Sequence, residues 1–368
     1  MTSTARPAAS ATAPAFAVTR TPTPRPDEER AAALAAPRFG EVFTDHLVRI
    51  TWTADAGWHD HRVEPYGPLA LEPATAVLHY GQEIFEGLKA YRHPDRSVWT
   101  FRPADNAARF RASARRMALP ELPEADFLAS LEALLAIDEP WVPDAPDTTL
   151  YLRPFLVGME PTLLVRASRH VEYLLIASPV GPYFRGTAPV AIWVEQEHHR
   201  AGRGGTGAAK TMGNYAASLA AQRVAYGHGC EQVCFLDDAG NLEELGGMNV
   251  VVVLADGSVV TPALGTILAG ITRDSVLTLL RDAGRDVAER ALPLAEVLAG
   301  LASGEVTEVF ACGTGAVVSP IGRLVGDGFD VVVGDGRPGP VTAAVRRELT
   351  DVQHGRAPDA RGWLHRLV

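Results

Sequence analysis

The pattern of apolar and polar residues divides the chain into two regions. Between Phe39 and Pro179, the apolar runs "VFTDHLVRITW", "AVLHYG" and "EYLLIAS" are typical of strands, and the amphipathic stretches "DNAARFRASARRMAL" and "ADFLASLEALLAI" are typical of helices. The segment "SPVGPYFRGTAP" then concentrates Pro and Gly between two apolar runs, as an interdomain connection does. We therefore predict a small α+β domain over residues 31–181, a connection over 182–198 and a larger domain over 199–368.

The second region alternates expected strands with expected helices. Its strands are "VAIWVEQ", "EQVCFLD", "NVVVVL", "SVVTP" and "EVFAC", and "ADGS" between two of them predicts a hairpin, because Asp-Gly tolerates the positive φ angles of such a turn. Helices are expected over residues 214–226 and roughly 270–281. The apolar positions of "GTILAGITRDSVLTLL" share one helix face, which indicates a buried helix with its N-terminus near Gly265. Such a terminus favours an anion.

Composition limits the kinds of partner. The 368 residues exceed what one hydrophobic core usually serves, and 47% apolar with 21% charged residues is ordinary for a globular protein. The net charge of −10 argues against nucleic acid and anionic membranes and favours small molecules. No run of 18 apolar residues exists, and the Ala-, Thr- and Pro-rich start lacks the apolar core of a secretory signal. We expect a cytoplasmic protein whose residues 1–30 form a flexible tail.

Three cysteines, Cys230, Cys234 and Cys312, form no CxxC pair. Such a sparse, odd set fits a reducing compartment better than a disulfide framework. Cys230 and Cys234 could chelate a metal together, but no His lies near them in the motif, so buried packing is the favoured interpretation. We predict no metal site.

The stretch "AGRGGTGAAKTMGNYAA" places glycines ahead of Lys210 and Thr211. A phosphate loop of the Walker type needs Gly directly before its Lys-Thr pair, but Ala209 occupies that place and the upstream spacing also fails. A nucleotide hydrolase is therefore a weak alternative. A partly desolvated lysine can instead act covalently and form a Schiff base, for which pyridoxal phosphate is the obvious carbonyl partner.

Pyridoxal phosphate requires a lysine, an anion site for its phosphate, a donor at its ring oxygen and a carboxylate at its pyridine nitrogen. The sequence offers a candidate for each. Taken singly, each candidate has an ordinary explanation, since a lysine near glycines is usually solvated and Tyr215 at the start of a helix usually packs. Of Glu243 and Glu244 in "NLEELGGMN", only one can face the ring, because neighbours on a strand point to opposite sides.

Seven segments in a fixed order resemble the branched-chain amino acid aminotransferases, which are pyridoxal-phosphate enzymes of fold type IV. The resemblance runs from Phe39 to the region of Leu324, in "HYGQEIFEGLKAYR", "FRPADNAARF", "YLRPF", "GGTGAAKTMGNYAASLAAQ", "LEELGGMNV", "GTILAGITRDS" and "EVFACGTGAVVSPIG". It implies a mixed α/β fold with a smaller N-terminal α+β domain and a larger C-terminal domain around a β-barrel-like core. It also implies transamination of L-leucine, L-isoleucine or L-valine with 2-oxoglutarate, giving branched-chain 2-oxo acids and L-glutamate.

The resemblance assigns a role to each cofactor contact. Lys210 would bind the aldehyde and shuttle the substrate proton, Tyr215 would hydrogen-bond the ring oxygen, and Glu244 would pair with the pyridine nitrogen while Glu243 points away. The phosphate would lie among Arg109, the backbone N–H groups of Thr266 and Ile267, and Thr314. Arg102 and Arg111 are expected to be exposed charges.

Substrate binding has to serve an apolar side chain and the second carboxylate of glutamate in one pocket. The resemblance implies that an arginine, Arg153, serves that carboxylate at the edge of an aromatic pocket, and that the substrate α-carboxylate lies on backbone N–H groups around Thr314 and Gly315. Ordinary core filling remains an alternative for some of the aromatic residues. The aromatic walls would be Phe39, Tyr80, Phe85, Tyr151 and Tyr183.

Departures from the family pattern bear on specificity. Met212 stands where family members commonly have Gly, and Ala316 and Ser319 stand where some animal relatives carry a redox-active cysteine pair. A D-amino acid aminotransferase or an aminodeoxychorismate lyase of the same fold is the nearest alternative, and a non-catalytic binding module is a more distant one. The resemblance also implies a homodimer in which loops of the first domain cross into the partner's pocket.

Overall fold

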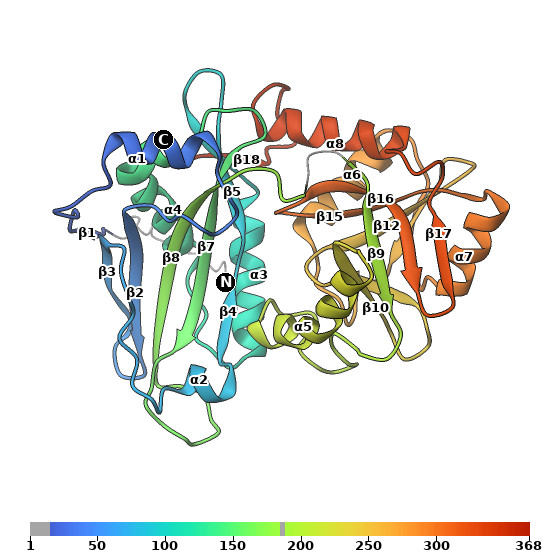
Figure 1. The fold of residues 1–368 in the computed structure, drawn as a ribbon. Helices are drawn as coiled ribbons and strands as arrows, with labels where there is room; N and C mark the ends of the chain where they lie inside the picture. The colour runs from blue at the N-terminus through green and yellow to red at the C-terminus, as the bar shows by residue number, and fades with distance from the viewer. Residues whose placement is uncertain (1–14, 185–187) are drawn as a thin grey trace, which may run out of the picture.

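The computed structural model describes residues 15–184 and 188–368, which form two nine-stranded sheets lying side by side (Figure 1). The first sheet has the strand order β1-β3-β2-β8-β7-β5-β6-β18, with β4 paired to β7. Its long neighbours β7 and β8 pair antiparallel over ten registered positions, from Thr149 opposite Val180 to Gly158 opposite Val171. The strands are β1 Ala17–Val18, β2 His46–Thr53, β3 Gly57–Pro65, β4 Glu83–Phe85, β5 Leu88–Arg92, β6 Val98–Phe101, β7 Thr149–Gly158, β8 His170–Val180 and β18 Leu364–Arg366.

The second sheet closes on itself. Its order is β11-β10-β9-β16-β15-β12-β13-β14, with β17 paired to β16, and an additional pairing of β11 with β12 joins six of these strands into a ring. The closing register places Glu244 opposite Asn249. The predicted barrel-like core is therefore confirmed. The strands are β9 Val190–Glu195, β10 Gln232–Leu236, β11 Leu242–Leu245, β12 Asn249–Leu254, β13 Val259–Pro262, β14 Val287–Arg290, β15 Val306–Gly313, β16 Val317–Gly326 and β17 Phe329–Val332.

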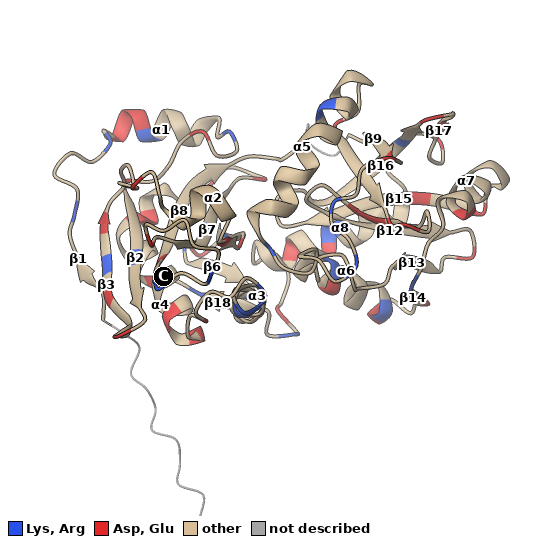
Figure 2. Cartoon of the chain, turned by 90° about the horizontal axis from the view of Figure 1, so that it is seen from below, with Lys and Arg blue, Asp and Glu red and all other residues tan. Residues whose placement is uncertain are grey.

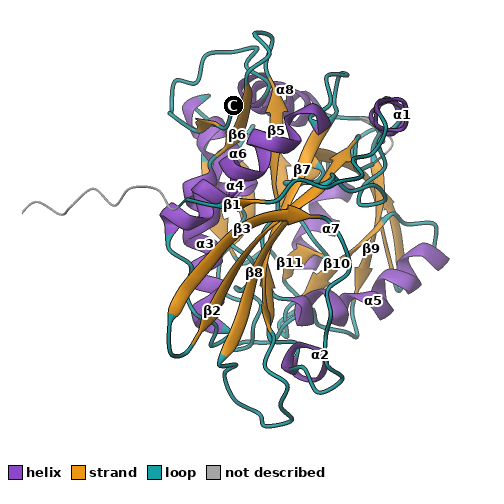
Figure 3. Cartoon of the chain, turned by 90° about the vertical axis from the view of Figure 1, so that its left-hand side faces the viewer, coloured by secondary structure: helices purple, strands orange, loops and turns teal. Residues whose placement is uncertain are grey.

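Helices cover both sheets and create separate hydrophobic cores. Against the first sheet, α3 and α4 bury Phe110, Phe127 and Leu134 completely, and the two helices lie together in Figure 3. A further core packs α6 and α8 against the barrel and includes Tyr91 and Phe101 of the first sheet, so the two halves share apolar contacts. The helices are α1 Asp27–Ala35, α2 Ala76–Tyr80, α3 Pro103–Arg116, α4 Glu124–Asp138, the 3-10 turn Glu139–Trp141, α5 Met212–Gly227, α6 Ile271–Asp282, α7 Leu294–Ser303 and α8 Pro340–Gln353.

The ends of the chain differ from the expected division. Residues 1–14 of the predicted tail lie outside the described residues, but Ala17 and Val18 pair with β3, and α1 already begins at Asp27. The backbone N–H of Thr21 donates to His46 and that of Arg25 donates to Asp45, so residues 17–30 lie along the first sheet instead of forming a flexible tail. At the other end, β18 pairs with β6, which returns the C-terminus to the first sheet.

Several local expectations can be compared with the structure. The Asp-Gly hairpin is confirmed, because β12 and β13 pair antiparallel and Gly257 has φ +85°. The strand expected at "AVLHYG" is wrong: these residues form α2, which ends at Gly81 in the left-handed conformation. Five residues are too few for periodicity to separate strand from helix. The connection predicted over 182–198 contains β9, which belongs to the second sheet.

Charged residues of both signs are scattered along the chain. In Figure 2, Lys and Arg are interspersed with Asp and Glu along the helices and loops. Arg102, expected to be exposed, donates instead to Asp105, Asp274 and Ser275, because it joins the start of α3 to α6. Within residues 15–184 and 188–368, no helix is long and apolar enough to cross a membrane.

Candidate active site

A cavity of about 470 Å³ lies where the two sheets meet. The first half contributes β4, β7 and α3, and the second contributes the start of α5, the end of β11, the start of α6 and the turn between β15 and β16. Most of the residues expected at the site line this cavity. They are Phe39, Phe85, Arg109, Tyr151, Arg153, Tyr183, Lys210, Met212, Tyr215, Glu244, Thr314 and Gly315.

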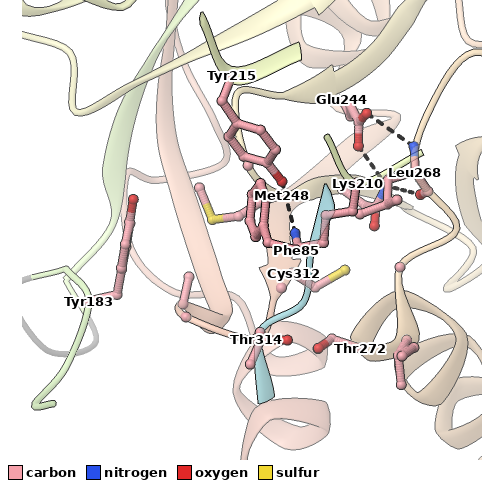
Figure 4. A pocket seen from close by; sticks show the side chains of 18 of the residues that line it. Phe85, Tyr183, Lys210, Tyr215, Glu244, Met248, Leu268, Thr272, Cys312 and Thr314 are labelled. Carbon is pink, nitrogen blue, oxygen red and sulfur yellow. Dashed lines mark hydrogen bonds between the residues drawn. The ribbon is translucent and has the colours of Figure 1, made fainter. Parts of the chain in front are cut away.

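Lys210 is fixed to the first half of the chain by its backbone. Its carbonyl accepts a hydrogen bond from the N–H of Phe85 at 2.9 Å, and its own N–H donates to Ser113 Oγ at 3.0 Å. The side chain extends into the cavity, where its Nζ donates to the hydroxyl of Tyr215 at 2.8 Å (Figure 4). The amine also lies 4.9 Å from the centre of the Phe85 ring. Two segments far apart in sequence therefore hold one lysine.

Glu244 lies at the junction that closes the barrel. Its Oε1 is 2.7 Å from Arg200 Nη1 and accepts the N–H of Leu268 at 3.1 Å, and its Oε2 accepts from Asn249 Nδ2 at 3.3 Å. Burial raises its pKa to about 7, although Arg200 and the Leu268 N–H act in the opposite direction. The carboxyl group is therefore held in one place and can exist with or without its proton near neutrality.

Glu243 points to the other side of β11, as strand alternation predicts. Its carboxylate accepts a hydrogen bond from the hydroxyl of Thr266, and both residues line a second cavity. Thr266 and Ile267 were expected to present N–H groups to a phosphate in the main cavity. They line the second cavity instead, because the helix start expected near Gly265 is wrong: α6 begins at Ile271, with Gly270 as its N-cap.

The start of α6 occupies the place that was expected for those two residues. Gly270, Ile271 and Thr272 line the main cavity, and the first N–H groups of a helix have no partner within it. Figure 4 shows the Thr272 hydroxyl opposite that of Thr314 across the cavity. Gly270 is required here, since a Cβ would come within 2.0 Å of Asn249 Oδ1. Helix dipole and hydroxyl groups together make this a candidate anion site.

Arg109 supplies the positive charge beside this anion site. It is held by Glu86, through Nε at 2.7 Å and Nη2 at 2.8 Å, and its Nη1 donates to the carbonyl of Ala269 at 2.9 Å. Glu86 is fully buried and also accepts from Asn106. Burial opposes the ionised form of Glu86, but the Arg109 charge outweighs it and lowers the pKa of Glu86. The arginine is therefore oriented before any ligand binds.

Aromatic rings form the opposite wall of the cavity. Phe39 packs edge-on against Tyr151 at 4.9 Å and against Tyr183 at 5.4 Å between ring centroids. The Arg153 guanidinium lies 4.5 Å from the Phe85 ring centre, and its Nη2 donates to the Tyr151 hydroxyl at 3.1 Å. A Cβ at residue 87 would lie 2.0 Å from that hydroxyl, so Gly87 makes room for the ring.

Tyr80 does not line this cavity. It is the last residue of α2, its side chain is 40% exposed, and its hydroxyl donates to the carbonyl of Leu163 at 2.5 Å. The expected aromatic wall is therefore incomplete within one chain. The helix that replaces the predicted strand at this position directs the ring toward the loop between β7 and β8.

The turn between β15 and β16 is held from behind by two cations. Lys89 Nζ donates to the carbonyl of Gly315 at 3.1 Å, and Arg346 Nη1 donates to the carbonyl of Ala316 at 3.4 Å and to that of Val318, in β16, at 2.5 Å. Val317, the first residue of β16, has φ +60°, a conformation that β-branched residues adopt only at a cost. Burial next to Arg346 lowers the pKa of Lys89 to about 8. Lys89 and Arg346 thus bind the carbonyl groups on one side of the turn, and the other side of the turn faces the cavity.

The cysteines are buried, in agreement with the packing interpretation. Cys312 lines the cavity, where burial raises its pKa to about 12, so its thiol carries no charge near neutrality. Among the residues that the structure describes, no group of three or more His, Cys, Asp and Glu side chains could hold a metal ion.

Sequence reasoning missed the residues that act as supports. Glu83, Glu86 and Lys89 occupy nearby positions of one quoted motif, "GQEIFEGLKA", where their charges in an apolar strand were a usable signal. Arg200 and Arg346 carried no such signal, because their partners come from distant segments of the chain.

The chain matches the family model for amino-transferase class IV over residues 83–324. The matched range contains both the lysine and the anion site. Arg109 of the first half and Thr314 near its end also fall within it. The chain therefore belongs to the class IV aminotransferases.

Two similar relatives carry the name branched-chain-amino-acid aminotransferase. It is 51% identical to the branched-chain-amino-acid aminotransferase of Mycolicibacterium smegmatis, over 96% of this chain and 98% of the relative. It is 50% identical to a probable branched-chain-amino-acid aminotransferase of Streptomyces coelicolor, over 97% of this chain and 100% of the relative.

Solved structures with the same name share the fold. The branched-chain amino acid aminotransferase of Escherichia coli matches with a TM-score of 0.71 at 26% identity, covering 87% of this chain and 99% of that one. The branched-chain amino acid aminotransferase of Thermobaculum terrenum, in its PLP-bound holo form, matches with a TM-score of 0.73 at 23% identity, covering 88% of this chain and 98% of that one. At that lower identity the likeness concerns the fold alone.

The Arg200–Glu244 pair gives a prediction about stability. Replacing Arg200 with Met leaves the Glu244 carboxyl buried without its cation, so its folded-state pKa rises further above the ordinary value of 4.5. A folded state that holds a proton more tightly than the unfolded chain loses stability as pH rises toward that folded-state pKa. We expect Arg200→Met to lower the free energy of unfolding by about 3 kcal/mol at pH 8. At pH 6 this loss of stability should be smaller by about 1–2 kcal/mol.

The measurement is urea unfolding at the two pH values, with Arg111→Met as a control because Arg111 lies on the outside of α3, with a 43% exposed side chain. An equal loss of stability at pH 6 and pH 8 would show that Arg200 contributes packing alone.

Proposed function

We propose that this protein transfers the amino group of L-leucine, L-isoleucine or L-valine to 2-oxoglutarate with pyridoxal phosphate as cofactor, giving branched-chain 2-oxo acids and L-glutamate. One observation carries the proposal: a single cavity contains the amine of Lys210, the buried carboxyl group of Glu244 and the candidate anion site at the start of α6. The same cavity has an apolar wall that contains one arginine, Arg153. The names of the relatives at 45–51% identity support the same substrates.

The residues present fit pyridoxal phosphate. Lys210 would hold its aldehyde carbon, Tyr215 its ring oxygen and Glu244 its pyridine nitrogen. The N–H groups of Ile271 and Thr272, with Arg109 and Thr314, would hold its phosphate, so Ile271 and Thr272 replace the two residues first expected. Glu244 supports this fit, since it lines the cavity and its carboxyl group is held in place by Arg200 and Asn249.

The bound cofactor supplies an electron-withdrawing ring that makes the substrate Cα acidic. Lys210 takes the proton from that carbon and returns one, as a general base and then a general acid. Tyr215, whose hydroxyl is 2.8 Å from the Lys210 amine, orients it. The turn at Thr314 and Gly315 binds the α-carboxylate through its N–H groups, while Lys89 and Arg346 bind the turn's carbonyl groups at Gly315 and Ala316.

The wall of Phe39, Phe85, Tyr151 and Tyr183 receives an apolar side chain and excludes water from it. Arg153 binds the second carboxylate of glutamate in the half-reaction that uses glutamate. Met212 lines the cavity and is 40% exposed, so its thioether lies at the edge of the pocket, where it can contact a bound side chain.

Substrate choice tests this proposal. We expect turnover of L-leucine, L-isoleucine and L-valine with 2-oxoglutarate, and at least a hundredfold lower kcat/KM for D-alanine, because Arg153 and the aromatic wall accept an apolar group on one side of Cα only.

The measurement is steady-state transamination with each amino acid, together with an assay for pyruvate release from aminodeoxychorismate. Preferential turnover of D-alanine, or release of pyruvate from aminodeoxychorismate at a comparable rate, would reassign the protein within its fold.

We further place the enzyme in the cytoplasm as a homodimer whose partner subunit completes the pocket. Support comes from an exposed apolar surface that we call the α2 patch. The Tyr80–Leu163 hydrogen bond ties its two parts together, and the backbone N–H of Thr162 donates to the carbonyl of Ala74. A cluster of exposed apolar residues of this kind is typical of an interface. The α2 patch consists of Leu78, Tyr80, Leu163, Leu164 and Val165, which are 40–84% exposed.

The dimer makes its own prediction. The wild-type protein should elute with twice the mass of the 39.3 kDa chain, and Leu164→Asp should yield monomers with at least tenfold lower turnover, because a buried charge disrupts an apolar interface. Light scattering after size exclusion measures the mass. Val332→Asp, at a 58% exposed position on β17, is the matched control and should remain an active dimer. A fully active monomer of the wild-type protein would refute the interface.

A further inference from the structure

Glu83 is an acidic residue inside the cavity that the proposed mechanism does not use. It is the first residue of β4 and lines the cavity together with Phe85, whereas Ile84 between them points into the core and is fully buried. Its Oε2 accepts the N–H of Met212 at 3.0 Å, and its backbone carbonyl accepts from Thr211 Oγ1 at 2.7 Å. Among the described residues its Oε1 has no hydrogen-bond partner.

Arg153 lies among the aromatic residues of the same cavity. Its guanidinium stacks on Phe85 and donates to the Tyr151 hydroxyl, but its Nε is buried without a hydrogen-bond partner among the described residues. Within residues 15–184 and 188–368, it forms no ion pair closer than 4.0 Å. Glu83 is two residues from Phe85 on the same strand face, and its charge acts on Arg153. This half-buried cation therefore has an acidic neighbour in Glu83 and, among the described residues, no fixed acidic partner.

The two substrates of transamination place opposite demands on the charge of Glu83 beside Arg153. With an apolar side chain in the pocket, Arg153 needs a negative neighbour, because a buried cation without one is unstable. With glutamate or 2-oxoglutarate in the pocket, the substrate carboxylate itself pairs with Arg153, and a second negative charge nearby repels it. A fixed carboxylate at position 83 would favour the first substrate, and a fixed neutral group would favour the second.

We propose that Glu83 determines this dual specificity by changing its protonation with the substrate: it is ionised beside Arg153 when an apolar side chain is bound, and neutral when a dicarboxylic acid is bound. The proposal rests on the proposed function. Glu83 takes up one proton from water when the dicarboxylic acid enters and releases it when that substrate leaves, so that charge near Arg153 stays balanced in both half-reactions.

The surroundings of Glu83 place its titration in the required range. Burial raises its pKa to about 7, and the Met212 N–H, Arg153 and Lys210 act against this rise. Below pH 7 the neutral acid predominates, and above pH 7 the carboxylate does. Charged and titratable groups also lie on the elements that pack against β4. They are Arg153 and Tyr151 from β7, Lys210 just before α5, Tyr215 in its first turn, and Arg109 and Arg116 from α3. Arg109 is bound to Glu86, and Arg116 donates to the carbonyls of Gly204 and Gly205.

The test compares two unreactive ligands on the enzyme loaded with pyridoxal phosphate. Glutarate carries a second carboxylate and 4-methylvalerate carries an isopropyl group instead, and neither has an amino or oxo group to react. If glutarate binds only when Glu83 is protonated, its Kd rises about eightfold between pH 6.5 and pH 8, and its binding takes up about three quarters of a proton per site at pH 7.5. For 4-methylvalerate the Kd stays constant or falls as pH rises, and no proton is taken up.

Calorimetric titration in buffers of different ionisation enthalpy measures proton uptake directly. Glu83→Gln keeps an oxygen that can accept the Met212 N–H, so the strand and the start of α5 stay in place. In this variant we expect glutarate to bind with no proton uptake and with a Kd independent of pH. The ratio of kcat/KM for L-glutamate to that for L-leucine should also lose its dependence on pH. Glu121→Gln, which changes an acid outside the cavity, should behave as the wild type.

The outcomes separate this inference from the proposed function. If both ligands bind and leucine is transaminated, but glutarate takes up no proton, or the Glu83→Gln variant takes up as many as the wild type, the role of Glu83 is refuted and the proposed function stands. If neither ligand binds and leucine is not a substrate, the proposed function fails and the inference fails with it.

Discussion

The hydrogen bond from the N–H of Phe85 to the carbonyl of Lys210 is the contact on which the site depends. It joins a strand of the first sheet to the segment that begins α5, and three further bonds at Ser113, Thr211 and Met212 surround it. Because the lysine backbone is fixed from both sides, its side chain can only extend into the space between the sheets. The cavity is therefore a consequence of how the two halves of the chain meet, and neither half contains it alone.

Charge in this cavity is arranged in pairs that come from separate elements. Glu86, which directly follows β4, orients Arg109 on α3, and Arg200 holds Glu244 at the pair of strands that closes the barrel. Such buried pairs contribute little net stability, but each fixes the position of a group that faces the ligand. Glu83 and Arg153 differ from them, since they share the cavity without a direct bond. The Glu86–Arg109 and Arg200–Glu244 pairs therefore suit roles that stay the same in both half-reactions. Glu83 and Arg153 suit a role that changes with the substrate.

The sequence predicted the fold class well, because hydrophobic periodicity and family motifs extend over long segments. It located Lys210, Tyr215, Glu244 and Thr314, which the fold brings to one cavity, although their roles stay predictions. It failed where only a few residues decide the conformation. The apolar face of "GTILAGITRDS" continues upstream of the true helix start, so the anion site was assigned to Thr266 and Ile267 in place of Ile271 and Thr272. It also could not foresee Arg200 or Arg346, because the partners of both lie in other segments of the chain.

The proposed mechanism requires that a cofactor aldehyde be attached to the amine of Lys210. Reduction of the purified yellow enzyme with borohydride makes that attachment permanent, and peptide mass mapping then locates it. We expect one pyridoxyl group per chain, on the peptide that contains Lys210, with loss of the visible absorption band. A pyridoxyl group on the buried Lys89, the only other lysine of the sequence, or a protein that shows no such band, would contradict the proposed mechanism.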